Sequence, residues 1–201
     1  FRTNEVVGLF KAAWTGDASR VNGVTGTHAS STYTATRNLL CPIDASSPCN
    51  ANIDSIAIAP YFGGEIGSQS RESEVELWDL DRLFEELEDV SIPLAISEMD
   101  DFVAFATLHN VTLISYEGGQ HLAGTGTAQE NQAITDLFTA ANRDSRMGDM
   151  YNIYFAAWKA RSNGIFTNFS NFTDYNKFGS WGAQEYLGQL PTSKSVSVSN
   201  F

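Results

Sequence analysis

Glu117 is the residue whose type and position most directly indicate chemistry. It ends the apolar segment VTLISYE (111–117) and is followed by two glycines. A carboxylate at a strand end can act as a nucleophile or a general base, and the glycines would let a ligand approach it closely. We therefore take Glu117 as a candidate catalytic residue. The alternative is a glutamate in a surface salt bridge.

Tyr61 is the residue that we expect to assist Glu117. It ends the segment IDSIAIAPY (53–61), which Pro60 stops as a strand. Side chains alternate between the two faces of a strand, so Tyr61 points away from the isoleucines of its segment. If those isoleucines pack on helices, Tyr61 and Glu117 share one interior, where the phenol would donate to the carboxylate and keep it ionised. A packing tyrosine at a barrel rim is the alternative.

Further polar and aromatic residues follow the strand-like segments and are candidates for contacts with ligand hydroxyl groups. They are His28, Gln120, His121, Asn168 and Trp181. Trp181 has glycines nearby and could offer its ring face to a sugar, or pack in a core. The two histidines bind ligand hydroxyls or lie on the surface. Neither has a partner at metal-ligand spacing, so no metal is expected.

The elements that must position these residues alternate along the chain without a linker. Strand-like segments begin near residues 21, 53, 111 and 164, and helical segments lie near 4–14, 31–40, 73–87, 97–108, 129–141 and 146–161. Ser73 and Glu76 have capping-box spacing, and Pro93 is expected to break the helix that they start. Four strands alternating with helices predict an α/β fold with a parallel sheet, whose carboxyl edge gathers ligand chemistry.

Composition narrows the range of partners. The chain has 201 residues, 42% of them hydrophobic and 18% charged, which excludes disordered, collagen-like and coiled-coil chains. Its net charge of −12 disfavours nucleic acid and favours a neutral or cationic partner. No apolar run reaches the roughly 18 residues of a membrane span, so no membrane partner is expected. Nor is there a Gly-rich phosphate loop, an HExxH pair or a CxxC pair.

Two cysteines indicate the cellular compartment in which the protein folds. Cys41 and Cys49 lie in one Pro/Ser-rich loop, which predicts a local disulfide and therefore a secreted or periplasmic protein. Two free thiols are the alternative. The chain begins at Phe1 without signal-peptide features, and we interpret it as a processed product or a fragment.

Three segments together are similar to one family: IAPYFGG (58–64), SYEGGQH (115–121) and NKFGSWGAQEY (176–186). They resemble the C-terminal half of a (β/α)8 TIM-barrel retaining glycoside hydrolase, from the clan whose nucleophile glutamate ends strand seven. The resemblance covers about residues 20–187 and implies strands five to eight with their helices. It also implies that Glu117 attacks the anomeric carbon, that Tyr61 hydrogen-bonds it, and that Trp181 floors a sugar subsite. No cofactor is implied.

The chain departs from this family in lacking a second carboxyl group. Retaining hydrolysis needs an acid/base about 5–5.5 Å from the nucleophile. In the clan this residue ends strand four, which would precede Phe1, and neither Glu65 nor Glu98 has the right position. We expect residues 1–190 to be a half-barrel domain and 191–201 a polar tail. Hydrolysis of a polysaccharide would then require the N-terminal half or self-association.

Two other interpretations remain open from the sequence. One is a non-catalytic carbohydrate-binding or structural protein that keeps the barrel scaffold without its chemistry. The other is a flavodoxin-like domain with four or five strands. That domain needs a phosphate-holding loop after its first strand, and VNGVTGTHAS (21–30) is a poor one.

Overall fold

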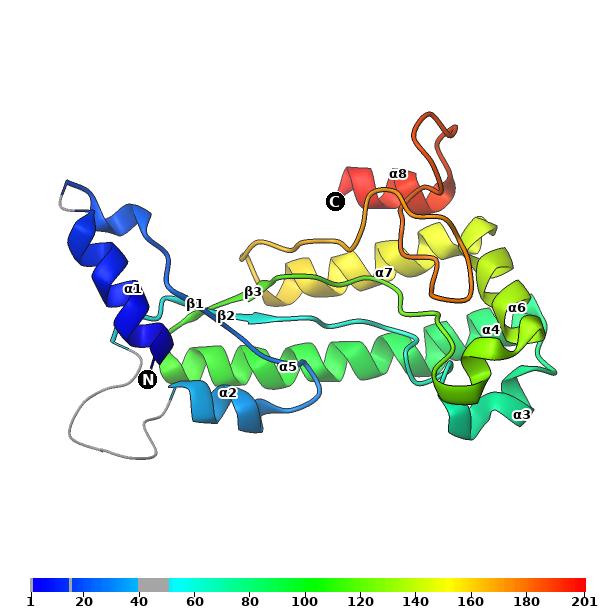
Figure 1. Ribbon diagram of the computed structural model, residues 1–201, viewed down its shortest axis with the longest axis horizontal. Coiled ribbons are helices and arrows are strands. Elements are labelled where there is room, and N and C mark those ends of the chain that lie inside the picture. The colour runs from blue at the N-terminus through cyan, green and yellow to red at the C-terminus, as the bar shows by residue number, and fades with distance from the viewer. Residues whose placement is uncertain (1, 15, 40–50) are drawn as a thin grey trace. The chain divides into compact units, whose positions relative to one another are not determined.

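A computed structural model of the chain describes residues 2–14, 16–39 and 51–201, which form an α/β fold (Figure 1). They divide into two compact units. The first comprises the described residues of Phe1–Pro60 together with Glu98–Tyr116 and Arg161–Phe166. The second comprises Tyr61–Ser97, Glu117–Ala160 and Thr167–Phe201. Each unit is thus assembled from segments that are distant in the sequence.

A parallel sheet forms the centre of the first unit. Its strands are β1 (Val24–Gly26), β2 (Ser55–Ile58) and β3 (Thr112–Ser115), in the order β1-β2-β3 (Figure 1). All four residues of β2 are buried, and this strand is the central one of the three. The predicted α/β fold and parallel pairing are confirmed at this level, with an open sheet in the described residues.

The fourth predicted strand, over 164–170, is wrong as an extended element. Phe166 forms one isolated parallel bridge with Ser115, and the Ser115 N–H donates to the Ile165 carbonyl at 2.8 Å. The segment GIFTNFS contains glycine, asparagine and serine, residue types that pair poorly in strands. No barrel is formed by the part of the chain that the structure describes.

The register of the sheet also corrects the argument from strand alternation. Ile56 of β2 pairs with Leu113 of β3, and paired residues of parallel strands point to the same face. If side chains continued to alternate beyond the strand ends, Glu117 would therefore lie on the same face as the isoleucines of β2. Tyr61 would lie on the opposite face. Alternation does not bring the two residues together. Both lie beyond the strand ends, and loops of the second unit position them.

Helices make up most of the remaining described structure. They are α1 (Arg2–Ala13), α2 (Thr32–Leu39), α3 (Glu72–Val75), α4 (Leu80–Glu86), α5 (Ile92–His109), α6 (Gln132–Arg143), α7 (Arg146–Arg161) and α8 (Ser193–Asn200). The 3-10 turns are η1 (Ala18–Arg20), η2 (Gln69–Arg71) and η4 (Gly126–Glu130), and η3 (Leu87–Ser91) is a π-helical turn. The helices predicted near 4–14, 31–40, 97–108, 129–141 and 146–161 are confirmed.

The helix predicted over 73–87 is wrong in its start and its end. The chain forms two short helices there, and α4 is capped by Asp79, whose carboxylate accepts from the Arg82 N–H at 2.9 Å. Pro93 does not break the chain's helical course: it is the second residue of α5, directly after the π-helical turn η3, whose bonding pattern differs from that of an α-helix. The π-helical turn η3 joins α4 to α5.

Aromatic side chains of α7 form the core of the second unit. Tyr151 and Tyr154 are fully buried, and their rings lie 5.6 and 5.0 Å from the ring of Phe62. Phe62 directly follows the segment that leaves β2. This packing fixes the segments on which the predicted site residues lie.

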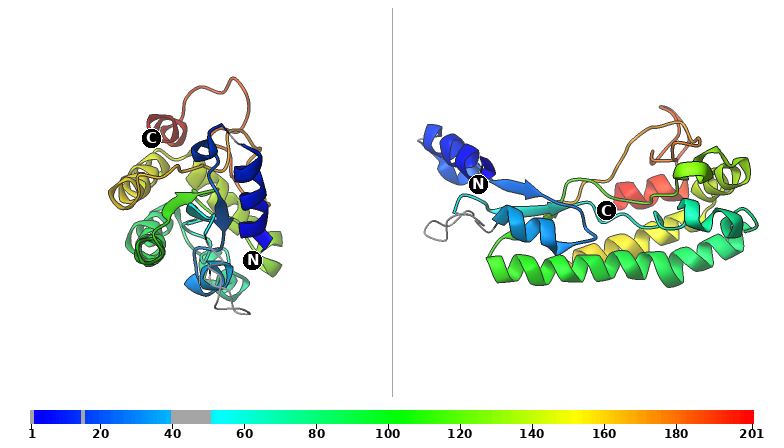
Figure 2. Two further views of the ribbon diagram at one scale, coloured as in Figure 1. Left: turned by 90° about the vertical axis from the view of Figure 1, so that its left-hand side faces the viewer. Right: turned by 60° about the horizontal axis from the view of Figure 1, so that its bottom comes forward.

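The polar segment 191–201 contains a docked helix. Helix α8 begins after Thr192, whose side chain accepts from the Ser195 N–H, and it runs beside α7 (Figure 2). Ser197 donates to the Gly148 carbonyl of α7 at 2.9 Å. A Cβ at Gly148 would lie 2.8 Å from Ser193, so glycine is what allows this close approach. Among the described helices, none has the length and apolar character needed to cross a bilayer.

Candidate functional site

Four of the second unit's rings form an aromatic cluster, which we define as Tyr61, His121, Phe169 and Trp181. The ring centroids of His121 and Trp181 are 4.8 Å apart. Tyr61 lies 5.5 Å from His121 and 6.0 Å from Trp181, and Phe169 lies 6.0 Å from Trp181. All four pairs meet edge to face, the favourable geometry for aromatic rings. The structure thus brings together three of the residues singled out in the sequence.

The main chain holds the indole of Trp181. Its Nε1 donates to the Phe178 carbonyl at 2.8 Å, and its own carbonyl accepts from the Ser170 N–H at 3.0 Å. Gly179 has a φ of 117°, and a Cβ there would lie 2.3 Å from the indole ring. Only glycine fits at this position, because it tolerates positive φ and leaves the space that the ring occupies.

Hydrogen bonds between main-chain groups join the three segments that carry the cluster. Phe62 donates to the Gly119 carbonyl at 3.1 Å, and His121 donates to the Phe62 carbonyl at 2.7 Å. Phe169 donates to the Gly118 carbonyl at 2.9 Å. The segments after β2, after β3 and after α7 are therefore fixed to one another within the second unit.

Gln120 is fully buried and hydrogen-bonds the segment that carries Trp181. Its side-chain Nε2 donates to the Ser180 carbonyl at 2.9 Å, and its Oε1 accepts from the Leu122 N–H at 2.7 Å. These bonds connect the loop after β3 to the residue before Trp181. Gln120 therefore positions the loop that carries Trp181, which we call the indole loop. Direct contact of Gln120 with a ligand stays a prediction.

Lys194 of α8 also donates a hydrogen bond to the Ser180 carbonyl. It is fully buried, and its Nζ donates to Ser180 O at 2.8 Å and to Asn142 Oδ1 at 2.7 Å. The Nζ also lies 5.1 Å from the ring centre of Tyr175 and 5.8 Å from that of Tyr151. Burial lowers the pKa of the Lys194 ammonium well below its usual range.

Unpartnered polar atoms are concentrated at this site. Six buried side-chain N and O atoms have no hydrogen-bond partner in the described residues, and five of them lie on four residues of this region. They are His121 Nδ1, both amide atoms of Asn168, Ser170 Oγ and Ser180 Oγ. An unsatisfied buried polar group costs about 1–3 kcal/mol, so such atoms are normally paired with an ordered water or a ligand. A ligand rich in hydroxyl groups would supply both donors and acceptors.

Glu117 is half-buried and lies close enough to His121 for its charge to act on the imidazole. Burial lowers the pKa of His121, while the charges of Glu65 and Glu117 act in the opposite direction. The imidazole is therefore neutral near pH 7, with one nitrogen that donates and one that accepts. Ser91 donates to the carboxylate of Glu65, which orients this second acid.

Other predicted residues lie elsewhere. His28 belongs to the first unit, where it lines a separate pocket. Cys41 and Cys49 lie outside the described residues, so the predicted disulfide stays a prediction. In the part of the chain that the structure describes, no group of three His, Cys, Asp or Glu side chains is placed to hold a metal ion.

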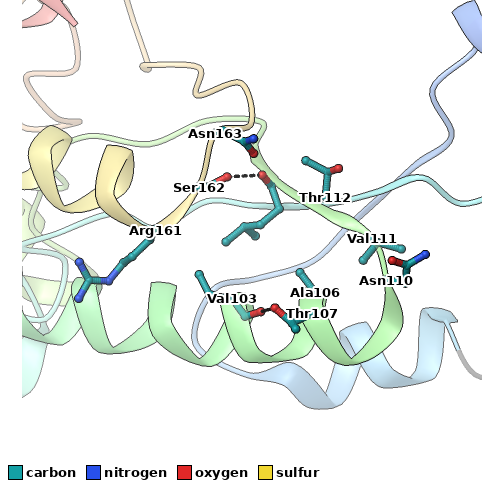
Figure 3. A pocket seen from close by; sticks show the side chains of 10 residues that line it. Val103, Ala106, Thr107, Asn110, Val111, Thr112, Arg161, Ser162 and Asn163 are labelled. Atoms are coloured by element: carbon teal, nitrogen blue, oxygen red, sulfur yellow. Dashed lines mark hydrogen bonds between the residues drawn. The ribbon is translucent and has the colours of Figure 1, made fainter.

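A pocket of about 370 Å³ in the first unit is a weaker candidate (Figure 3). Two of its hydroxyl groups are already used, since Thr107 and Ser162 donate to main-chain carbonyls at 2.8 and 2.7 Å. The Arg161 side chain pairs with Asp100 at 2.7 Å. These three polar side chains of the pocket therefore serve the fold.

Several residues of the candidate site carried no sequence signal of their role. Phe169, Ser170 and Ser180 lie in a region of loops rich in polar and aromatic residues. Lys194 stands among serines, where a lysine is normally solvated, so its burial could not be predicted.

The chain has no significant match to a protein-family model, to a curated protein or to a solved structure. Function is therefore inferred from the chemistry of the site.

Proposed function

We propose that this protein binds a polysaccharide at the aromatic cluster and belongs to the retaining glycoside hydrolases in its chemistry, with Glu117 as the nucleophile. One observation carries the proposal: five unpartnered buried polar atoms lie on residues beside or within a cluster centred on the indole of Trp181. Hydroxyl groups satisfy such atoms, and the apolar face of a sugar ring stacks on an indole. The net charge of −12 favours a neutral ligand of this kind.

In the proposed reaction, a carboxylate oxygen of Glu117 attacks the anomeric carbon while the bond to the leaving oxygen breaks. A second carboxylic acid protonates that oxygen, and then, as a base, activates the water that hydrolyses the glycosyl ester. Tyr61 would orient the nucleophile. The neutral His121 and the amide of Asn168 would hydrogen-bond the sugar hydroxyls.

The acid/base residue would come from outside the described half of the site. We propose that the three-stranded sheet is part of a (β/α)8 barrel completed by an N-terminal half-barrel or by a second copy of the chain. The strand β1 forms one edge of the described sheet and could pair with a further strand of such a barrel, whereas the outer edge of β3 is met by residues 162–166. Export to the periplasm or the medium would match polysaccharide degradation.

Binding can be tested on the 201-residue chain itself. Calorimetric titration with cellohexaose, xylohexaose and mannohexaose should detect at least one ligand, and Trp181→Ala should weaken it at least tenfold. Trp14→Ala is the matched control, because Trp14 is half-exposed on the first unit and lies outside the cluster. Loss of binding in both variants, or in neither, would contradict the assignment of the cluster.

Catalysis needs the gene product with any sequence that precedes Phe1. A mechanism-based fluoro-sugar should label the peptide that contains Glu117, and Glu117→Gln should lower hydrolysis at least a thousandfold while the protein still binds sugar. Labelling at another carboxylate would remove Glu117 from the mechanism.

A non-catalytic carbohydrate-binding protein is the second candidate. It is favoured by the absence, in the described residues, of a partner carboxylate positioned for catalysis, since Glu65, which acts on His121 together with Glu117, already accepts from Ser91. Sugar binding without hydrolysis or labelling, measured on the complete gene product, would establish this alternative.

A further inference from the structure

A second pocket lies in the first unit and has a volume of about 410 Å³, within the range of small-molecule sites. It is lined by Gly26, Thr27, His28, Thr34 and Tyr116. These residues come from the end of β1 and the segment that follows it, from α2, and from the residue after β3. The pocket belongs wholly to one compact unit.

Thr27 provides an unpartnered polar group in this pocket. Its hydroxyl is the sixth buried side-chain atom without a hydrogen-bond partner among the described residues, and the side chain belongs to a residue that is 6% exposed. The Thr27 N–H donates to the Ala57 carbonyl at 2.9 Å, so the main chain is fixed by the sheet. The hydroxyl is thus held in place with its donor and acceptor capacity unused.

Tyr116 provides an aromatic surface. Its residue is 44% exposed, and its N–H donates to the Ile58 carbonyl at 3.1 Å, which anchors it to the sheet. Gly26 lies beside this ring, where a Cβ would be 4.0 Å from Tyr116 Cε1. A larger side chain at residue 26 would extend over this part of the ring, so the glycine leaves the Cε1 edge uncovered by residue 26.

The chemistry of the lining identifies the class of ligand. Among the described residues, the lining contains hydroxyl groups, an imidazole and an aromatic ring, and no Asp, Glu, Lys or Arg side chain. An anionic ligand would find no cation among these lining residues and would be repelled by the chain's net charge of −12. A neutral molecule with many hydroxyl groups and an apolar ring face matches the lining.

We propose that this pocket is a second saccharide-binding site, in which a sugar ring stacks on Tyr116 and hydrogen-bonds Thr27 and His28. The inference rests on the proposed function for the class of ligand, but on different residues in a different unit. It extends sugar recognition to a surface that the aromatic cluster does not include.

The experiment compares variants of the 201-residue chain by calorimetric titration with cellohexaose, xylohexaose and mannohexaose. Tyr116→Ala should weaken binding of the best hexasaccharide at least fivefold or remove one binding equivalent. Gly26→Leu should have the same effect by filling the pocket, and it provides an independent test if Tyr116→Ala does not fold. Tyr33→Ala is the matched control, because Tyr33 is exposed on α2 of the same unit and does not line the pocket.

The outcomes separate this inference from the proposed function. Binding that Trp181→Ala weakens and that neither pocket variant changes would overturn the second site and leave the aromatic cluster supported. Binding that only the pocket variants weaken would support the second site and refute the cluster. A wild-type chain that binds none of the three hexasaccharides would refute both.

Discussion

Replacement of Lys194 by methionine tests whether this buried amine holds the indole loop. In the wild type, its Nζ donates to Asn142 Oδ1 at 2.7 Å and to Ser180 O at 2.8 Å. Methionine fills a similar volume without a donor. Asn142 Oδ1 would then lose the donor that the structure gives it, whereas Ser180 O would keep its bond from Gln120.

The magnitude follows from these bonds. Leaving one buried acceptor unsatisfied costs about 1–3 kcal/mol, and losing one of two bonds at the second acceptor costs about 1 kcal/mol more. We therefore expect Lys194→Met to lower the free energy of unfolding by about 2–4 kcal/mol at the pH where the wild-type amine is neutral.

The pH dependence gives a sharper test. Burial lowers the pKa of Lys194 in the folded state, while the charge of Glu185 opposes this shift. Between the folded pKa and the unfolded value of about 10.4, the unfolded chain binds more protons. The free energy of unfolding of the wild type should therefore rise with pH in that window, by up to about 1.4 kcal/mol per pH unit, and the variant should lack this rise. Burial raises the pKa of Tyr151 and Tyr175. Their contribution to the free energy of unfolding therefore declines only above about pH 10, in the wild type and the variant alike.

The assay is urea unfolding of both proteins at pH 6, 7, 8 and 9, followed by circular dichroism. The difference in the free energy of unfolding between wild type and Lys194→Met should grow as the pH increases. Lys159→Met is the control, because Lys159 is exposed on α7, and its curve should run parallel to that of the wild type. A constant difference for Lys194→Met, or a variant that is more stable at every pH, would refute the reasoning.

Two further predictions address the backbone and the cysteine loop. Gly119→Ala should lower the free energy of unfolding by about 2 kcal/mol more than Gly188→Ala, because both have positive φ but only the first would place a Cβ 2.8 Å from the Tyr151 hydroxyl, as urea unfolding would show. Equal losses of unfolding free energy in the two variants would mean that the structure shifts to relieve the contact with the Tyr151 hydroxyl. Non-reducing mass spectrometry should detect a link between Cys41 and Cys49, and two alkylatable thiols would remove the support for export.

Elements with a clear hydrophobic period could be predicted from the sequence. The helices α6 and α7 and the strands β2 and β3 lie where the pattern of apolar residues places them. The start of α4 was missed because Ser73 and Glu76 mimic a capping box, while Asp79 provides the cap in the structure. Local capping motifs compete along the chain, and packing decides between them.

The candidate site could be predicted in part. Tyr61, His121 and Trp181 were each recognised by type and position, and their rings do meet. The route by which they meet was not predicted, because strand alternation fails beyond Ile58 and Ser115, where loops take over. Buried support such as Lys194 depends on tertiary packing, which a single sequence does not reveal.

The main-chain contacts that hold Trp181 have a consequence for protein engineering. The indole rests against the backbone of Gly179 and is tied to the Phe178 carbonyl, so main-chain groups help to hold its tilt. Phe169, which the proposed reaction does not use, could be exchanged for other residues to reshape the surrounding surface while these main-chain contacts to the indole are kept. A library that varies residue 169 and preserves residues 178–181 is therefore a rational route to altered ligand preference.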